Sequence, residues 1–268
     1  MSGRLAILCG QGGLPVALAE TESDAVCVAF QGVAHDLTGP VVLHRFERLG
    51  EMFADLRARG VTRVVLAGAM SRPALDPAVL DPLMMALAPR LMAAMQGGDD
   101  ALLRLILSVI EEQGFAVMGA HELRPDLLAA AGHLAGPAPG PRDLEDAARA
   151  ADILMALAPL DVGQGAVVAG GLVLGIETVQ GTDAMLDFVG VTPSALRRGA
   201  GGVFVKASKR GQDLRVDMPA IGPDTIARAA AAGLRGIVLE AGRVLILERA
   251  RTVAACDSAG IFLLARDL

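Results

Sequence analysis

The first half of the sequence alternates between short apolar runs and amphipathic stretches, and this alternation limits the possible folds more than any other feature. The runs that suit strands lie at 4–10, 24–30, 61–69 and 115–120. The helical patterns lie at 14–22, 46–60, 76–95 and 99–114. Strand, helix and strand at this spacing require crossover connections, so the pattern predicts a parallel sheet covered by helices. We expect an α/β protein whose N-terminal domain is Rossmann-like.

The second half has a different rhythm. Residues 135–142, AGPAPGPR, contain three prolines and two glycines and read as a linker. After a helical stretch, residues 165–177 read as a hairpin around Gly170-Gly171, and 237–249 repeat this shape around Ala241-Gly242. We therefore predict domains at 1–134 and 143–268, joined by the linker at 135–142. The second domain is expected to be a mixed α+β domain.

Composition excludes several functions. The net charge is −6, and the chain has no Trp or Tyr, so nucleic acid is not expected as a partner. No apolar run reaches the roughly 20 residues that a membrane-spanning helix needs. The three cysteines lie far apart in the sequence, which indicates buried thiols rather than a disulfide framework or a zinc site.

The stretch GQGGLP, residues 10–15, follows the first strand and opens a helix. Glycines there let a phosphate approach backbone N–H groups at the positive end of a helix, and Pro15 suits the first helical turn. A dinucleotide fingerprint needs a glycine where Pro15 stands, so NAD is disfavoured but a nucleotide is not. The alternative is a tight turn without a ligand. The candidate binding residues are Gly12, Gly13, Leu14 and Pro15.

Further polar residues follow other expected strands or begin expected helices, where ligands of parallel sheets commonly bind. For each, a polar loop or a helix N-cap is the alternative. The candidate substrate-binding residues of this kind are Ser71, Arg72, Asp99, Asp100 and Thr182, with Asp183 as a candidate catalytic residue. Gln164, which precedes an expected strand, is a further candidate for substrate binding.

Residues 206–223, KASKRGQDLRVDMPAIGP, concentrate charges of both signs. If the segment is extended, Asp213, Arg215 and Asp217 face the same side. Like charges two residues apart repel unless a cation lies between them, so a divalent cation held by carboxylates gives this arrangement a purpose. Lys206 and Lys209 would then bind phosphate oxygens. The alternative is a solvated loop with surface ion pairs.

The sequence lacks the Walker loop, the zinc-protease motif and the nucleophile elbow. A phosphate-cleaving enzyme with this sequence would hold its metal by carboxylates. Two other classes stay open on the residues alone. One is a nucleotide-sugar oxidoreductase that uses the first domain for a cofactor, and the other is a non-catalytic carrier of a lipid or nucleotide.

Seven motifs in this order resemble those of the LpxI family, over nearly the whole chain from Leu5 to about Phe262. RVDMPAIGP and GTDAML are the specific ones, and the glycine turn is weak by itself. The motifs are GQGGLP, GAMSRP, QGGDDALL, GAHE, DVGQGAVV, QGTDAML and QDLRVDMPAIGPDTI.

The resemblance implies Mg²⁺-dependent (or Mn²⁺-dependent) hydrolysis of UDP-2,3-diacylglucosamine to UMP and 2,3-diacylglucosamine 1-phosphate in lipid A synthesis. The resemblance implies that the substrate is this lipid-linked nucleotide sugar. It also implies a cytoplasmic protein that is peripheral to the inner membrane, and it allows a homo-oligomer. The family's essential aspartate corresponds to Asp217. We expect Asp217, with Asp213 or Asp183, to bind the metal, and Lys206, Lys209 and Arg215 to neutralise phosphoryl charge.

The resemblance also explains the apolar composition, since the protein would have to bind the two acyl chains of the substrate. The segment PLMMALAPRLMAAM, residues 82–95, could line their path because methionine adapts to irregular shapes. The alternative is an ordinary core helix.

Overall fold

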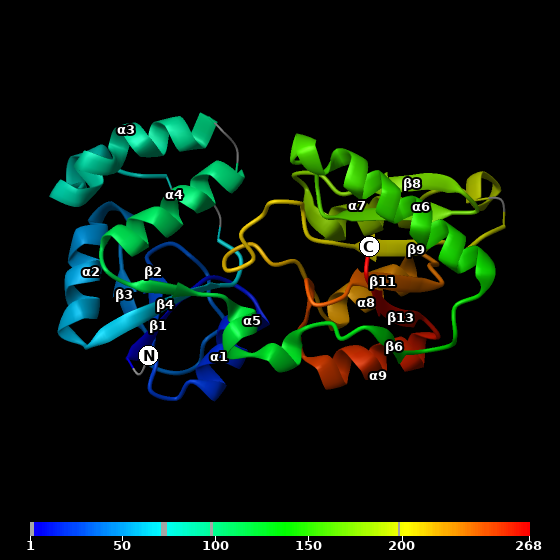
Figure 1. Ribbon diagram of the computed structural model, residues 1–268, viewed down its shortest axis with the longest axis horizontal. Helices are drawn as coiled ribbons and strands as arrows, with labels where there is room; N and C mark the ends of the chain where they lie inside the picture. The colour runs from blue at the N-terminus through cyan, green and yellow to red at the C-terminus, as the bar shows by residue number, and fades with distance from the viewer. Residues whose placement is uncertain (1–2, 71–73, 97–98, 198) are drawn as a thin grey trace. The chain divides into compact units, whose positions relative to one another are not determined.

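The computed structural model describes residues 3–70, 74–96, 99–197 and 199–268 (Figure 1). The chain forms two compact units. The first contains Met1–Pro125 and Asp213–Asp217, and the second contains Asp126–Gln212 and Met218–Leu268. The chain therefore passes from one unit to the other three times, at 125/126, 212/213 and 217/218.

The first unit contains a five-stranded sheet in the order β3-β2-β1-β4-β5, and every pair is parallel. The order reverses beside β1, so the loops after β1 and β4 lie at the switch point of the sheet. The predicted parallel, Rossmann-like sheet is confirmed, although the sequence missed the short strand β3. The strands are β1 (Arg4–Cys9), β2 (Val26–Phe30), β3 (Val42–His44), β4 (Val61–Ala67) and β5 (Ala116–Met118).

Helices cover both faces of this sheet. Met52, Leu87 and Ile110, from three different helices, are buried in the same core cluster as Ala6 and Val64 of the sheet. Alternation along the strands sends neighbouring side chains to the other face. The helices are α1 (Gly13–Thr21), α2 (Leu49–Ala58), α3 (Pro82–Gln96), α4 (Asp99–Glu112) and α5 (Ala120–Leu123). The 3-10 turns are η1 (Phe46–Arg48) and η2 (Pro77–Val79).

The second unit has a six-stranded mixed sheet in the order β6-β13-β11-β9-β7-β8. Its centre is parallel, since β11 pairs in parallel with β9 and β13. Its edges are antiparallel through β6, β7 and β8, which confirms the predicted mixed sheet. The strands are β6 (Gly132–Ala135), β7 (Gly165–Ala169), β8 (Leu172–Ile176), β9 (Val203–Lys206), β11 (Gly236–Glu240) and β13 (Phe262–Arg266).

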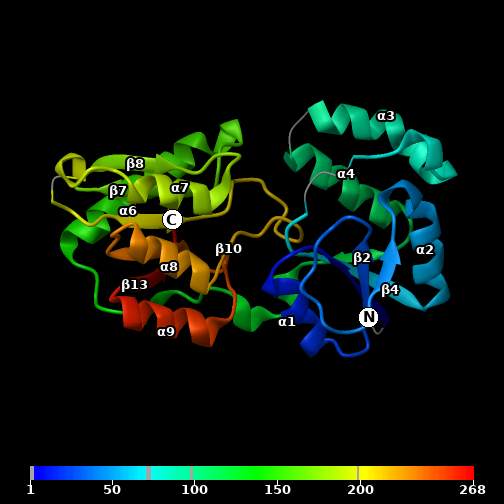
Figure 2. The ribbon, with the colours of Figure 1, turned by 180° about the vertical axis from the view of Figure 1, so that it is seen from behind.

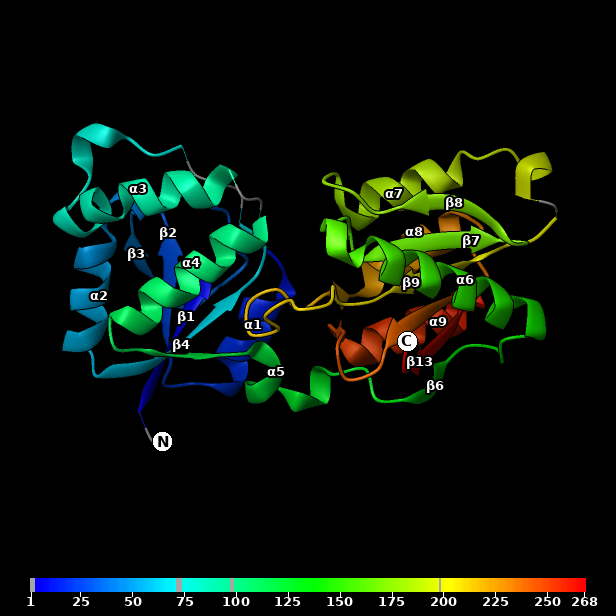
Figure 3. The ribbon, with the colours of Figure 1, turned by 45° about the horizontal axis from the view of Figure 1, so that its top comes forward.

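Helices again lie on both faces of the sheet. Figure 2 shows α7, α8 and α9 on one face, and Figure 3 shows α6 on the other. The helices are α6 (Pro141–Leu157), α7 (Gly181–Gly190), α8 (Pro223–Ala231) and α9 (Arg249–Ala259). The 3-10 turns are η3 (Pro125–Leu127), η4 (Ala158–Leu160) and η5 (Ser194–Arg197).

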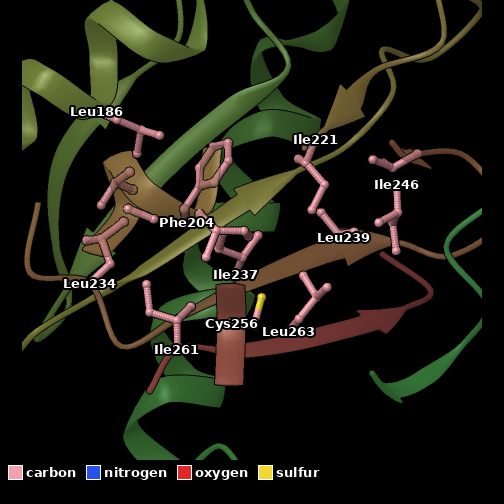
Figure 4. Packing of buried hydrophobic residues seen from close by; sticks show 14 of the residues in the cluster. Leu186, Phe204, Ile221, Leu234, Ile237, Leu239, Ile246, Cys256, Ile261 and Leu263 are labelled. Carbon is pink, nitrogen blue, oxygen red and sulfur yellow. The ribbon is translucent and has the colours of Figure 1, made fainter. Parts of the chain in front are cut away.

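The sheet of the second unit separates two core clusters. Phe204 and Ile237 face one cluster together with Leu186 of α7 and Cys256 of α9 (Figure 4). Val205, the next residue after Phe204, belongs to the opposite cluster, which contains residues of α6. Burial on both faces explains why the central strands are continuous apolar runs.

One hairpin prediction is confirmed and the other is wrong. β7 and β8 pair antiparallel on either side of Gly170-Gly171. After Gly242 the chain instead forms β12 (Leu245–Ile246), which pairs in parallel with β10 (Ala220–Ile221) in a separate small sheet. The N–H groups of Ala129 and Leu245 donate to Val244 and Pro219 across this region. Those non-local partners replace the local hairpin.

The predicted boundaries at 134 and 143 stay a prediction. Residues 126–134, assigned there to the first domain, are counted in the second unit, where Gly132–Ala135 forms an edge strand. Within the described part of the chain, no helix is both long enough and apolar enough to cross a bilayer.

Candidate functional site

The loops after β1 and β4 are joined edge to edge at the switch point of the first sheet. Gln11 and Ala69 exchange backbone hydrogen bonds of 2.9 and 2.8 Å, and Gly10 N–H donates to Ala67 at 2.8 Å. A Cβ on Gly68, whose φ is +89°, would lie 2.7 Å from the carbonyl oxygen of Gln11. Part of this glycine-rich pattern therefore serves the close approach of two backbones.

The N-terminus of α1 has a partner that the sequence did not suggest. Asp36, in the loop between β2 and β3, accepts a hydrogen bond from Gly12 N–H at 2.6 Å. A carboxylate is favourable at the positive end of a helix, and it repels a phosphate placed at the same N–H. Gly13, Leu14 and Pro15 then form the first helical turn. The role of this turn in substrate binding stays a prediction.

Four of the predicted binding residues cannot be placed. Ser71 and Arg72 lie outside the described residues. Helix α4 begins at Asp99, but the side chains of Asp99 and Asp100 are likewise outside the described part.

The segment Asp213–Asp217 forms a turn, so the expected extended alternation is wrong. The N–H groups of Val216 and Asp217 both donate to the carbonyl oxygen of Asp213 at 3.2 Å. Arg215 folds back onto the Asp213 side chain with Nε–Oδ1 and Nη2–Oδ2 distances of 3.0 and 2.7 Å, and its N–H donates to Oδ1 at 3.0 Å. Arg215 therefore does not lie next to Asp213 along one side of an extended segment. It binds both carboxylate oxygens of Asp213.

This fork-to-fork contact sets the electrostatics of the turn. Hydrogen bonds from Arg215 lower the pKa of Asp213 below its ordinary value, so this carboxylate stays ionised to a more acidic pH than an ordinary aspartate does. Asp213 and Glu111 together raise the pKa of Arg215. The side chains of Asp213 and Arg215 are about one-third exposed at 30% and 32%, so solvent reaches both.

Contacts fasten the turn to the first unit although its sequence lies in the second half of the chain. Arg215 Nη1 lies 2.8 Å from Glu111 Oε1 on α4, and Val216 packs against the core cluster of the first sheet. A Cβ on Gly119, directly after β5, would lie 2.4 Å from the His121 ring and 3.3 Å from the Cα of Arg215. Gly119 therefore allows the imidazole and the turn to meet at the carboxyl end of β5.

In the second unit, the predicted residues Lys206 and Thr182 meet around an acid that the sequence analysis missed. Lys206 Nζ lies 2.8 Å from Glu177 Oε2 and 2.5 Å from Thr182 Oγ1. Thr182 Oγ1 donates to Glu177 Oε2 at 3.0 Å, so this hydroxyl does not cap α7. The side chains of Lys206 and Glu177 are only 6% and 11% exposed. The ammonium charge is thus neutralised inside the protein.

The remaining predicted residues of the second unit have other partners. Lys209 Nζ forms an ion pair with Asp161 at 2.7 Å, and Gln164 Nε2 donates to Gln212 at 2.9 Å. Gln212 also accepts from the N–H of Lys209 at 3.1 Å, which links Gln164 to Lys209. Asp183 Oδ2 lies 3.2 Å from Arg228 Nε on the neighbouring helix α8. Asp183 therefore has a cationic partner at the surface.

The turn at Asp213–Asp217 has the donor chemistry that suits Mg²⁺ or Mn²⁺. The side chains of the described residues form no cluster of three or more His, Cys, Asp or Glu that could enclose a metal. Mg²⁺ does not need one, because it is commonly bound by one or two carboxylates and completes its shell with phosphate oxygens and water. Asp213 and Asp217 offer two carboxylates in one turn.

Comparison with known proteins shows the class. Residues 4–127 match the LpxI N-terminal domain, and residues 130–264 match the LpxI C-terminal domain. The chain belongs to the LpxI family.

One protein of this family with high similarity to the chain comes from Caulobacter vibrioides. It is named UDP-2,3-diacylglucosamine pyrophosphatase LpxI, and the two chains are 40% identical over 274 aligned positions that cover 98% of each. The similarity therefore spans both units and the Asp213–Asp217 turn.

Proposed function

We propose that this protein hydrolyses the diphosphate bond of UDP-2,3-diacylglucosamine to UMP and 2,3-diacylglucosamine 1-phosphate, as a step of lipid A synthesis. The observation that carries the proposal is the 98% coverage by a relative named for this pyrophosphatase activity. The two-carboxylate turn supports it, because a divalent cation held by these carboxylates would offset the negative charge of a diphosphate.

In the proposed reaction, water attacks the phosphorus attached to the sugar. The new P–O bond forms as the bond to the bridging oxygen breaks, and the electron pair leaves with UMP. Asp217 positions the water and accepts a proton from it. Asp217 and Asp213 are the proposed ligands of Mg²⁺ or Mn²⁺, and Asp213 is preferred to Asp183 because it shares a turn with Asp217. Such a metal, when bound, neutralises phosphoryl oxygens and acidifies water.

Arg215 has two tasks in this proposal. Its guanidinium holds Asp213 in one rotamer, and a divalent cation would share that carboxylate with Arg215. Because Arg215 is about one-third exposed, it is also available to phosphoryl oxygens that gain charge in the transition state.

The contacts of Lys206 support a positioning role instead of direct contact with phosphate. Its ammonium joins Glu177, which follows β8, to Thr182 in the first turn of α7. The buried group thereby fixes where α7 begins, and Asp183 is the next residue on that helix. Lys209 is more accessible at 20% exposure and is the better candidate of the two for a phosphate contact.

We propose that the glycine turn binds the nucleoside end of UMP. Asp36, whose carboxylate lies 2.6 Å from Gly12 N, can accept hydrogen bonds from ribose hydroxyls or from the uracil N–H. A nucleoside suits this position better than a phosphate, because the Asp36 carboxylate at the α1 N-terminus would repel a phosphate. Ser71 and Arg72 remain candidates for the phosphate of UMP, and the enzyme is expected to work at the cytoplasmic face of the inner membrane.

The test is UMP release from UDP-2,3-diacylglucosamine with Mg²⁺ and with EDTA, in ¹⁸O-water. We expect metal-dependent UMP and label in the lipid phosphate. Label in UMP would keep the activity but place the attack on the other phosphorus. Tight binding of the lipid without turnover would favour a carrier, and reduction of a pyridine nucleotide would favour an oxidoreductase.

A further inference from the structure

Helix α3 of the first unit carries apolar side chains on its outer as well as its inner face. Met84 and Leu87 are buried in the core of the unit. Met85, Met92 and Met95 are 56%, 65% and 47% exposed. Met85 and Met92 are seven residues apart, which is about two helical turns, so they lie on one side of the helix. A surface helix normally carries polar residues on that side.

The outer face of α3 is also electrically neutral. Arg90 is the only charged residue between Pro82 and Gln96. Its guanidinium forms two hydrogen bonds of 2.9 and 2.7 Å with Glu112 and one of 3.0 Å with Ser108, both on α4. The one charge on the helix is therefore paired with an acid of α4, and the two charges cancel.

We propose that this outer face, defined by Met85, Pro89, Met92 and Met95, docks on the apolar surface of a lipid bilayer. The inference rests on the proposed function, since a substrate with two acyl chains resides in a bilayer and must be collected from it. Figure 3 shows α3 along the outside of its unit, next to α4.

A second copy of the chain is a poorer occupant of this face. A 15-residue helix is about 22 Å long and about 10 Å wide, so its exposed side covers roughly 200 Å². A stable protein–protein interface needs about 800 Å² from each partner. The face also lacks the aromatic residues and free arginines that dominate the energy of such interfaces.

The methionine side chains and the absence of net charge on this face both suit contact with the apolar part of a bilayer. The flexible thioether side chain adapts to an irregular and fluid apolar surface. Because no charge contributes, binding should not depend on anionic headgroups, and salt should not weaken it. The helix would lie in the plane of the interface, as other amphipathic anchors do.

The experiment is flotation of the full-length protein with phosphatidylcholine vesicles at low and high salt. The double variant Met85→Gln/Met92→Gln tests the face, and Leu160→Gln, which removes a 69% exposed apolar side chain of the second unit, is the matched control. We expect the double variant to bind at least about fivefold more weakly, because it loses apolar area buried against lipid. The control should bind like the wild type at both salt concentrations.

Equal binding by the double variant and the wild type would overturn the proposal, as would binding that requires anionic lipid or disappears in high salt. A dimer of the wild type that the double variant cannot form would assign the face to a second copy. UMP release from a short-chain substrate without vesicles separates the two ideas. Its absence in the wild type counts against the hydrolase, whereas normal release with α3-independent flotation counts only against the docking face.

Discussion

Two clusters of opposite charges in this protein differ in the exposure of their side chains. In the first unit, Arg215 holds Asp213 in a turn that solvent reaches. In the second unit, Lys206 holds Glu177 where almost no solvent enters. An exposed pair contributes little to stability but stays available to a ligand, whereas a buried pair is costly to break. Exposure therefore separates the proposed chemical group from the structural one.

The strongest test of this difference is Asp217→Asn. The substitution keeps the size of the side chain but removes the carboxylate that is proposed to position water and bind the metal. We expect kcat to fall by about 10³- to 10⁴-fold, as for the loss of a proton acceptor or charge stabiliser in other enzymes. UMP release measures kcat, and thermal unfolding should show a Tm close to that of the wild type. Near-normal kcat would remove Asp217 from the mechanism.

Breaking the buried pair should have the opposite signature. Glu177→Gln leaves the Lys206 ammonium buried without its counter-charge, which costs about 3–5 kcal/mol of unfolding free energy. Urea denaturation measures the loss. The double variant Glu177→Gln/Lys206→Met should lose less than the sum of the two single variants, because neither charge is then left alone.

A matched control for the buried pair is Asp161→Asn, which removes the 46% exposed partner of Lys209. We expect a loss of no more than about 1 kcal/mol for this surface pair. If the Glu177 and Asp161 variants lost equal stability, exposure would not explain the difference between the clusters.

The Asp213–Arg215 contact should give stability that depends on acid pH. The pKa of Asp213 is lower in the folded protein than in the unfolded chain, so its contribution is complete above the ordinary aspartate pKa of about 3.9. The contribution is lost as pH falls through the lower, folded pKa. The wild type should therefore exceed Asp213→Asn by about 1 kcal/mol at pH 7.

Urea unfolding of both proteins at several pH values between 7 and 2 checks this prediction, and the difference in stability should begin to shrink only below about pH 4. A gap that stays constant down to the lowest pH would show that the ion pair does not stabilise the turn.

The smallest expected effect concerns Asp36. Asp36→Ala removes the acceptor of the Gly12 N–H, which should cost about 0.5–1 kcal/mol of stability, as other losses at helix N-termini do. If Asp36 also binds the nucleoside, KM should rise more than kcat falls. Steady-state kinetics separates these parameters. An unchanged KM would leave Asp36 with a purely structural role at α1.

The sequence pattern predicted the fold correctly where residues that are close in the sequence are also close in space. The βα units of the first sheet and the β7–β8 hairpin follow from apolar period and glycine position. The pattern failed after Gly242, because the partners of Leu245 and Val244 are Pro219 and Ala129, far away in the chain. No local signal carries that information.

The candidate site shows the same limit. The charged segment at 213–217 was recognised from its composition, but its turn depends on the folding back of Arg215 and on Glu111, roughly a hundred residues earlier. Glu177 and Asp36 were missed because a single acid at a strand end or in a loop has no distinctive spacing. Their importance arises only from the cation or the N–H that the fold brings to them.

The passage of residues 213–217 into the first unit has a consequence for inheritance. The two halves that match separate family domains meet near residue 128, yet the second half of the gene encodes a turn that packs in the first unit. A recombination event at that junction would bring a foreign turn to the native Glu111 and Gly119. An exchange of one half with a distant relative would therefore have to preserve the fit of this turn to Glu111 and Gly119.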